Sequence, residues 1–366
     1  METPSHQLEQ AASVLLKNLG PHAVMMGSDI PSRCLQDMSN LPPARPWLFV
    51  RPSGAAEVAD VIRVALTHGI PVVPQGGLTG LCGGALPDVG AIALSTERLT
   101  GVEEIDPAAA TMIVGAGTPL ETVQKAADDA GLFYPVDLGS RGSCTIGGNI
   151  ATNAGGVRVI RYGMTRDMVL GLEAVLPDGS IMTSLNKMLK NNAGYDLKQM
   201  LIGSEGTLGV VTRAVLRLFP KPACTMLALC AVDDYRQAIK LLAAARSGLE
   251  PLLSAFEVMW PGYWAMATQR VAGLRDPFAG SHSSGSHAAY ILIEAQGSDA
   301  VADPERFGSW LERQAEAGLL ADGVVAQSVA DSRAFWAIRD ANSEFASHCG
   351  PCVDFDIGLA VGVMDD

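Results

Sequence analysis

Two glycine-rich segments carry the residue types that bind phosphorylated ligands. The first runs from Pro74 to Gly84 and the second from Asp137 to Gly156. Glycines at this density lack Cβ atoms and permit positive φ, so successive backbone N–H groups can converge on an anion such as a pyrophosphate. The second segment also offers threonine and asparagine side chains, which can hydrogen-bond a flat ring with polar edges. Together the two segments predict a site for a phosphorylated ligand.

The spacing of these glycines excludes two common nucleotide motifs. Neither segment contains the G-x-G-x-x-G pattern of a Rossmann site or the G-x-x-x-x-G-K-[ST] pattern of a P-loop. A nicotinamide enzyme and a P-loop nucleotidase are therefore disfavoured. The alternative interpretation is that the glycines only form tight turns. Two long segments that follow apolar residues favour the ligand site.

Four stretches identify the type of domain more closely. They begin at Arg51 (RPSGAAEVADVIRVALTHGIPVVPQGGLTGLCGGA), Asp137 (DLGSRGSCTIGGNIATNAGG), Arg161 (RYGMTRDMVLGLEAVLPDG) and Asn191 (NNAGYDLKQMLIGSEGTLGVVT). In order and spacing the chain resembles the FAD-binding domain of the vanillyl-alcohol oxidase / p-cresol methylhydroxylase (PCMH) superfamily. The resemblance is closest to the branch that holds D-lactate dehydrogenase, D-2-hydroxyglutarate dehydrogenase and the glycolate oxidase flavin subunit. It implies an α+β fold, in which a two-subdomain PCMH-type FAD-binding domain precedes a ferredoxin-like antiparallel-sheet cap domain.

FAD is the cofactor that this resemblance implies. The matching cofactor-binding positions are Gln75, Gly76, Gly77, Leu78, Thr79 and Gly80 in the pyrophosphate loop, Leu138, Thr145, Gly148, Asn149, Thr152, Asn153 and Gly155 around the ribityl chain and flavin ring, and Glu205, Gly206, Val210 and Val211 in a later stretch. Some relatives attach FAD through a histidine in or near these loops. Neither glycine segment contains a histidine, so we expect FAD to bind non-covalently.

The chemistry implied by the resemblance is oxidation of a D-2-hydroxy acid, lactate or a related acid, to the 2-oxo acid, with hydride transfer to flavin N5. Arg339 matches the substrate-binding arginine, whose planar fork binds a carboxylate through two charge-assisted hydrogen bonds. Ser343 follows four residues later, one helical turn on, and is expected to share its face. Asp354 stands where D-2-hydroxyglutarate dehydrogenases carry a lysine, which disfavours a dicarboxylate substrate.

The catalytic residues are expected beyond Asp366. The resemblance places the base and the metal-binding histidines in a later segment, and the sequence ends at Asp366 before it. We therefore interpret the chain as truncated. It contains no predicted metal site, and a divalent metal is expected only in a full-length parent. Two alternatives stay open: a non-catalytic FAD-holding subunit or degenerate flavoprotein, and an oxidase of the same superfamily that uses O₂.

Composition limits the partners. With 366 residues the chain is long enough for two domains, and its net charge of −13 argues against a nucleic-acid partner. No apolar run is long enough to span a membrane, and the N-terminus lacks a secretory signal pattern. Seven widely spaced cysteines are typical of reduced thiols, so a cytoplasmic location is expected. The expected partners are a small 2-hydroxy acid and an electron acceptor, either a protein or a quinone; a homodimer is left open.

Domain boundaries follow from the proline pair Pro220 and Pro222. We predict an N-terminal helical segment over residues 1–41, the FAD-binding domain over 42–221 and the substrate or cap domain over 222–366.

Local patterns predict the main elements of both domains. They are a helix over Ala55–His68, a second helix that begins at a capping box over Thr118–Glu121, a hairpin formed by Val169–Leu176 and Ile181–Thr183, a helix capped by Asp233, and a helix over Ser332–Ser347. In the cap domain the helices are expected on one face of the sheet.

Overall fold

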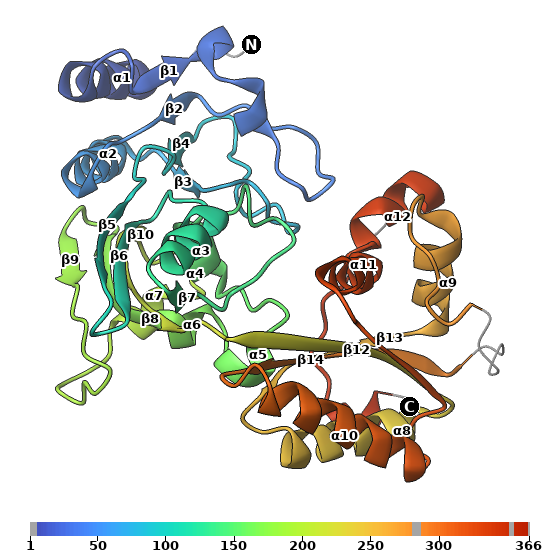
Figure 1. The fold of residues 1–366 in the computed structure, drawn as a ribbon. Coiled ribbons are helices and arrows are strands. Elements are labelled where there is room, and N and C mark those ends of the chain that lie inside the picture. The colour runs from blue at the N-terminus through green and yellow to red at the C-terminus, as the bar shows by residue number, and fades with distance from the viewer. Residues whose placement is uncertain (1–5, 280–286, 351–354, 365–366) are drawn as a thin grey trace. The chain divides into compact units, whose positions relative to one another are not determined.

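The computed structural model describes residues 6–279, 287–350 and 355–364 (Figure 1). Two compact units divide the chain. Unit 1 contains Met1–Gly156 and Gly163–Lys221, and unit 2 contains Val157–Tyr162 and Pro222–Asp366. The short segment Val157–Tyr162 thus leaves the first unit to join the second, which the predicted domain boundaries do not include.

The first sheet of unit 1 supports the N-terminal glycine-rich segment. Its strands lie in the order β1 (Val24–Met26), β2 (Leu48–Val50), β4 (Ile92–Ser95) and β3 (Val72–Gln75), and β2, β4 and β3 are parallel. Helices α1 (His6–Leu19) and α2 (Ala55–His68) pack on this sheet through a shared hydrophobic cluster. The predicted bounds of α2 are confirmed. β3 ends at Gln75, where the first glycine-rich segment begins.

The second sheet of unit 1 is antiparallel throughout. Its strands are β5 (Val102–Asp106), β6 (Thr111–Gly115), β10 (Val210–Arg217), β8 (Val169–Val175) and β9 (Ile181–Ser184), in that order. The predicted hairpin is confirmed, since Val175 of β8 pairs with Ile181 of β9.

Shorter elements lie between the strands of unit 1 or follow them. They are η1 (Gly27–Asp29), η2 (Ser32–Leu35), α3 (Leu120–Asp129), β7 (Leu132–Phe133), α4 (Ile146–Thr152), α6 (Thr165–Met168), α7 (Lys198–Leu201) and β11 (Phe219–Pro220). The capping box predicted at the start of α3 is wrong, because Pro119 is the N-cap and makes no side-chain capping bond. The Thr118 hydroxyl instead accepts a hydrogen bond from the Gly101 backbone N–H (2.9 Å).

Unit 2 is built on one antiparallel sheet. Its strands are β13 (Leu253–Met259), β14 (Ala289–Gly297), β12 (Cys224–Val232) and β15 (Asp322–Val325), in that order. Helices α8 (Tyr235–Gly248) and α10 (Ala302–Glu316) cover one face, whereas α9 (Pro261–Arg270), α11 (Val329–Arg339) and α12 (Asn342–Cys349) lie over the other (Figure 1). A last short element, η3, spans Val361–Val363.

Helices on both faces contradict the prediction of a sheet covered on one face. The physical reason lies in β14, where every residue is buried, so both sets of alternating side chains need apolar partners. The N-cap of α8 also differs by one residue from the prediction, since Asp234 rather than Asp233 accepts the hydrogen bond from the Arg236 N–H. The predicted α+β class is confirmed.

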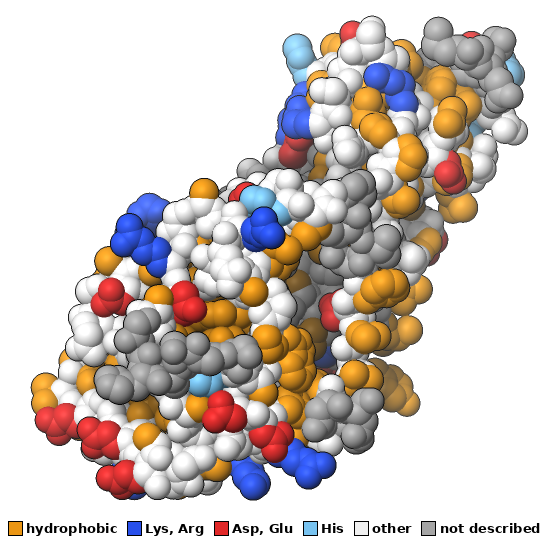
Figure 2. All heavy atoms as spheres, turned by 90° about the vertical axis from the view of Figure 1, so that its right-hand side faces the viewer, with side chains coloured by type: hydrophobic (Ala, Val, Ile, Leu, Met, Phe, Trp, Pro, Cys, Tyr) orange, Lys and Arg blue, Asp and Glu red, His pale blue; other side chains and the backbone are white. Residues whose placement is uncertain are grey.

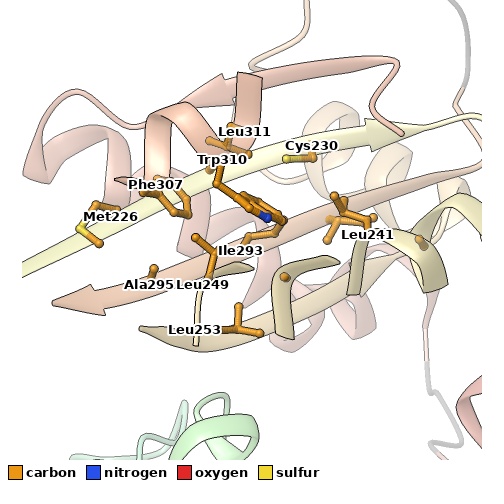
Figure 3. Close-up of a cluster of buried hydrophobic side chains, with 14 of the residues drawn as sticks. Met226, Cys230, Leu241, Leu249, Leu253, Ile293, Ala295, Phe307, Trp310 and Leu311 are labelled. Atoms are coloured by element: carbon orange, nitrogen blue, oxygen red, sulfur yellow. The ribbon is translucent and has the colours of Figure 1, made fainter. Parts of the chain in front are cut away.

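The core between the sheet and α8/α10 is formed around Trp310 (Figure 3). The side chain of Trp310 is 1% exposed, and its Nε1 atom donates to the Ala244 carbonyl (3.2 Å). A Cβ atom on Gly248 would lie 2.7 Å from Cδ1 of Trp310, so α8 needs glycine at that point to approach the indole ring.

A buried ion pair attaches helix α5 (Val159–Tyr162) and the residue before it to this sheet. Arg158 Nε lies 2.8 Å from Oε1 of Glu294, whose side chain is 1% exposed. The Ser254 hydroxyl donates to the same oxygen (2.7 Å), and Tyr162 donates to Oε1 of Gln296 (2.9 Å). The charge-assisted bonds from Arg158 and Ser254 satisfy the Glu294 carboxylate, which would otherwise be costly to bury.

The surface carries both signs of charge. On the face drawn in Figure 2, the coloured Lys and Arg side chains are interspersed with Asp and Glu among neutral and hydrophobic groups. Within the part of the chain that the structure describes, no helix has the length and apolar character needed to cross a bilayer.

Candidate cofactor and substrate sites

A cavity of about 780 Å³ in unit 1 contains the first glycine-rich loop. This volume is in the range of pockets for cofactors and other small ligands. Five predicted cofactor-binding residues line it: Gln75, Gly76, Gly77, Leu78 and Thr145. The structure thus brings residues from both glycine-rich segments to one site.

The two segments touch through their backbones. A Cβ atom on Gly76 would lie 2.7 Å from Oγ1 of Thr145, and one on Gly77 would lie 2.0 Å from the carbonyl oxygen of Ser143. Real Cβ atoms do not approach other atoms this closely, so a side chain at Gly76 would displace the Thr145 hydroxyl and one at Gly77 would displace the backbone of the facing loop. The glycines at these two positions are therefore required for the contact between loops.

Three predicted cofactor-binding residues have left-handed backbone conformations, which are unfavourable for residues with a Cβ atom. The φ angles are 56° at Leu78, 50° at Asn153 and 53° at Glu205. Such residues concentrate at functional sites, where the surrounding structure holds them. Their position in both glycine-rich segments and in the later stretch supports a ligand site there.

Helix α4 orders the second segment. Thr145 is its N-cap and accepts a hydrogen bond from the Gly148 N–H (3.3 Å). Asn149 is buried, and its Nδ2 atom has no acceptor among the described residues. Asn153 ends the helix, and its Oδ1 atom accepts from the Arg166 N–H (2.9 Å).

The later stretch packs against α4 and β3. The Glu205 N–H donates to the Ala151 carbonyl (2.9 Å), and a Cβ atom on Gly206 would lie 3.0 Å from Cγ of Pro74. Glu205 and Gly206 therefore adjoin both glycine-rich segments.

Other predicted cofactor-binding residues do not line the cavity. Val210 belongs to the hydrophobic cluster beneath α1 and α2, where it pairs with Val175 across the sheet. Those that lie outside the lining are Thr79, Gly80, Leu138, Gly148, Asn149, Thr152, Asn153, Gly155, Glu205, Gly206, Val210 and Val211.

Sequence reasoning missed one wall of the cavity. Residues of the segment Ser32–Met38 line it, together with Ser95, Glu97 and Thr100. Glu97 accepts hydrogen bonds from Arg51 (2.9 Å) and Arg33 (2.8 Å). Burial alone would raise the pKa of Glu97, but the two arginines hold it below its ordinary value. Neither glycine content nor periodicity marks this segment, so the sequence offers no pattern that identifies it.

In unit 2, Arg339 lies between two carboxylates. Its Nε atom donates to Oε2 of Glu257 (2.8 Å), its Nη2 atom lies 2.7 Å from the same oxygen in an ion pair, and Nη1 donates to Oδ1 of Asp340 (3.2 Å). Burial alone would lower the pKa of Arg339, but Glu257 and Asp340 raise it, so the guanidinium stays charged. Because arginine has five N–H donors, two remain without a partner among the described residues, one on each terminal nitrogen. This pair suits a bound carboxylate.

Ser343 does not share a helical face with Arg339. The helix predicted over Ser332–Ser347 is wrong, because α11 ends at Arg339 and α12 begins at Asn342. The chain turns where Ala341 enters the core at 3% exposure. The Ser343 hydroxyl donates to the Asp340 carbonyl (3.4 Å) and is exposed.

Asp354 lies outside the described residues, so the structure says nothing about the predicted dicarboxylate discrimination there. Among the residues that are described, no three His, Cys, Asp or Glu side chains form a group that could hold a metal ion.

Comparison with known proteins agrees with the site in unit 1. A family model for the FAD binding domain matches residues 46–184, and one for the C-terminal domain of FAD linked oxidases matches residues 221–360. The chain therefore contains the FAD binding domain and the C-terminal domain of the FAD linked oxidases, and its cofactor is FAD.

Individual relatives agree with this family assignment. The chain is 38% identical to D-2-hydroxyglutarate dehydrogenase, mitochondrial, of Arabidopsis thaliana, over 86% of this chain and 55% of the relative. It is 38% identical to D-2-hydroxyglutarate dehydrogenase of Xanthomonas citri pv. viticola, over 87% and 65%. The chain therefore spans less than two thirds of the length of these relatives. A crystal structure of p-cresol methylhydroxylase with substrate bound shares the fold, with a TM-score of 0.72 and 16% identity over 88% of this chain and 67% of that one.

Proposed function

We propose that this chain is the FAD-binding and substrate-positioning part of a D-2-hydroxy-acid dehydrogenase. The observation that carries the proposal is the meeting of the two glycine-rich segments at one cavity in unit 1, in a chain that also presents a charged, partly free arginine in unit 2. Both dehydrogenase relatives are named for the same reaction class, which supports the proposal.

The residues present fit the cofactor. Gly76 and Gly77 leave no side chain between the loops, and Oε1 of Gln75 is buried without a donor among the described residues. The loop Gln75–Gly80 would hold the pyrophosphate through backbone N–H groups. When bound, FAD supplies the acceptor for the hydride that leaves the hydroxyl-bearing carbon of the substrate.

Arg339 has the role of binding the substrate carboxylate. It can do so through its two remaining N–H donors while Glu257 and Asp340 fix the orientation of the guanidinium. It stays protonated and cannot accept the hydroxyl proton, so it orients the substrate rather than acting as a base. Ser343 is a second, weaker candidate for contact with the substrate.

Two observations point to different substrates. The relatives are named for D-2-hydroxyglutarate, a dicarboxylate. The carboxylates of Glu257 and Asp340 beside Arg339 favour a monocarboxylate such as D-lactate, because a second substrate carboxylate would be repelled. We propose D-2-hydroxy acids as the class, with a lactate-like acid preferred.

Anaerobic flavin bleaching tests the proposal. The FAD-loaded chain, and its parent if the gene encodes a longer one, are mixed with D- and L-lactate and with D- and L-2-hydroxyglutarate. Loss of flavin absorbance with a D-acid and not its L-enantiomer is the expected result, and no bleaching by any acid in either protein favours the non-catalytic flavoprotein. Rapid reoxidation by O₂ after bleaching would identify an oxidase instead.

We also propose an electron acceptor and an assembly. The acceptor is a protein or a quinone, and a homodimer is the assembly to test. The Arabidopsis relative is named as mitochondrial. For this chain the cytoplasmic location rests on the amino-acid sequence, and fractionation of the source cells tests it.

A further inference from the structure

The segment Ser32–Met38 shares the cavity with the loop Gln75–Leu78. It lies outside residues 46–184, the part matched by the FAD binding domain. Gln75 ties the segment to the loop, because its Nε2 atom donates to the carbonyl of Cys34 (3.0 Å) and to that of Ala85 (3.0 Å). A residue of the predicted pyrophosphate loop therefore fixes this wall in place.

Two residues that line the same cavity each have a buried oxygen atom with no hydrogen-bond donor among the described residues. These oxygen atoms are Oε1 of Gln75, whose residue is 1% exposed, and Oδ2 of Asp37, whose residue is 8% exposed. The orientation of the Gln75 amide follows from its two carbonyl acceptors, which require the nitrogen on that side. Buried acceptors are rarely left without a donor, so this pair indicates a ligand that brings donors.

Only one oxygen of Asp37 is available. Its Oδ1 atom accepts hydrogen bonds from the backbone N–H (3.0 Å) and the hydroxyl of Ser39. Asp37 also has no cationic partner among the described residues, whereas the other carboxylate of the cavity, Glu97, is paired with Arg33 and Arg51. Oδ2 of Asp37 is therefore a buried, uncompensated acceptor.

Charge decides which part of FAD can satisfy this oxygen. A carboxylate repels the phosphates of the cofactor, and it makes short, strong hydrogen bonds with hydroxyl and amino donors. FAD carries such donors in both halves, on the ribityl chain of the flavin half and on the ribose and adenine of the other half.

We propose that Asp37 binds FAD, with Oδ2 accepting a hydrogen bond from a hydroxyl or amino group of the cofactor. Ser32–Met38 is then part of the FAD site, although it precedes the FAD binding domain in sequence. This inference rests on the FAD site described above and adds a binding residue to it.

Asp37→Asn tests the proposal. The amide keeps an oxygen for Ser39 and places an NH₂ group where Oδ2 lies, so the charge-assisted hydrogen bond that the carboxylate oxygen accepts from the cofactor is lost. We expect FAD to bind roughly 10–100-fold more weakly, with an unchanged melting temperature of the apo-protein. FMN and ADP, titrated separately, identify the half that carries the donor, because only that half should lose affinity.

Unchanged affinity for FAD contradicts the proposal, and so does weaker FAD binding with unchanged FMN and ADP binding. Ser39→Ala is the matched control, since it removes a partner of Oδ1 and leaves Oδ2 in place; its FAD affinity should stay within about threefold of wild type.

If Asp37→Asn lowers the apo-protein melting temperature, the rise in melting temperature on adding FAD is compared instead. An equal rise in variant and wild type contradicts the proposal. A wild-type chain that takes up no FAD would refute the site itself, a separate result.

Discussion

A Cβ atom added to Gly77 would lie 2.0 Å from the carbonyl oxygen of Ser143, inside the distance that any real contact allows. The two residues belong to different glycine-rich segments, which are far apart in sequence and meet at one cavity. The glycine is thus required by protein packing, in addition to any close approach of a pyrophosphate. Its φ angle is not positive, so backbone strain is not the reason.

Gly77→Val should abolish FAD binding. The branched side chain would force the loop Gln75–Leu78 away from Ser143 and disrupt the cavity that both loops form. We expect no flavin absorbance in the purified variant. We also expect unit 2 to stay folded, so that its contribution to the far-UV circular dichroism spectrum is retained. Gly90→Val is the matched control, because Gly90 is exposed outside both glycine-rich segments and a Cβ atom there meets nothing within 4 Å. Flavin content in Gly77→Val equal to that of the control would show that the loop has been misassigned.

Arg158→Ala should destabilise unit 2 by about 3 kcal/mol. The substitution leaves the carboxylate of Glu294, 1% exposed, without its cation, and removing one partner of a buried pair typically costs about 3–5 kcal/mol. Urea unfolding measures the loss. Lys125→Ala is the control, since its pair with Asp129 is exposed and should change stability by less than about 0.5 kcal/mol. Equal stabilities of the two variants would contradict the structural role of the Arg158 pair.

Glu257→Gln should change substrate preference. The amide keeps a hydrogen-bond acceptor for Arg339 and removes one negative charge beside it. Calorimetric titration with pyruvate and 2-oxoglutarate should show the affinity for the dicarboxylate rising by roughly fivefold relative to the monocarboxylate, from about 1 kcal/mol of repulsion. Glu344→Gln, an exposed site in α12, is the control and should alter neither affinity. An identical change for both acids in Glu257→Gln would show that it does not govern specificity.

Stability should fall at alkaline pH. Complete burial raises the pKa of Cys230 from about 9.0 to about 12, so the folded state holds the neutral thiol where the unfolded state ionises. The stabilisation from the neutral thiol is full below pH 9 and is lost as the pH rises towards 12. At pH 10.5 the free energy of unfolding is lower by about 2 kcal/mol. Urea unfolding at pH 8 and 10.5 measures it. Burial also raises the pKa of Tyr134 and adds a loss of the same sign. The stability of Cys230→Ala should therefore depend less on pH than that of wild type, but the dependence should not vanish. A dependence equal to that of wild type would show that Cys230 does not contribute to it.

Much of the fold was predictable from local patterns. Helix α2 has apolar residues at helical spacing, and the hairpin of β8 and β9 is marked by the turn Pro177-Asp178-Gly179, so both were predicted close to their observed bounds. The break between α11 and α12 was not, because it contains neither glycine nor proline and depends on the burial of Ala341 in tertiary packing. The helices on the second face of the cap sheet were missed although the continuous apolar run of β14 indicates burial on both sides.

The site was only partly predictable for a similar reason. Gly76, Gly77 and Thr145 were identified by residue type, and the structure brings them together. Asp37 and Glu97 belong to segments without a recognisable pattern, and their proximity to the loop arises from long-range contacts such as the hydrogen bond from Gln75 to Cys34. Contacts of this kind depend on the fold and are not encoded in local spacing.

Titration of the apo-protein with FAD, followed by acid precipitation, tests the central claim most directly. The chain should take up one equivalent of FAD at the cavity formed by the two glycine-rich segments, and acid should release all of it into the supernatant. A colourless chain that takes up no added FAD would contradict the assignment of the site. Flavin that stays with the precipitate would contradict non-covalent binding.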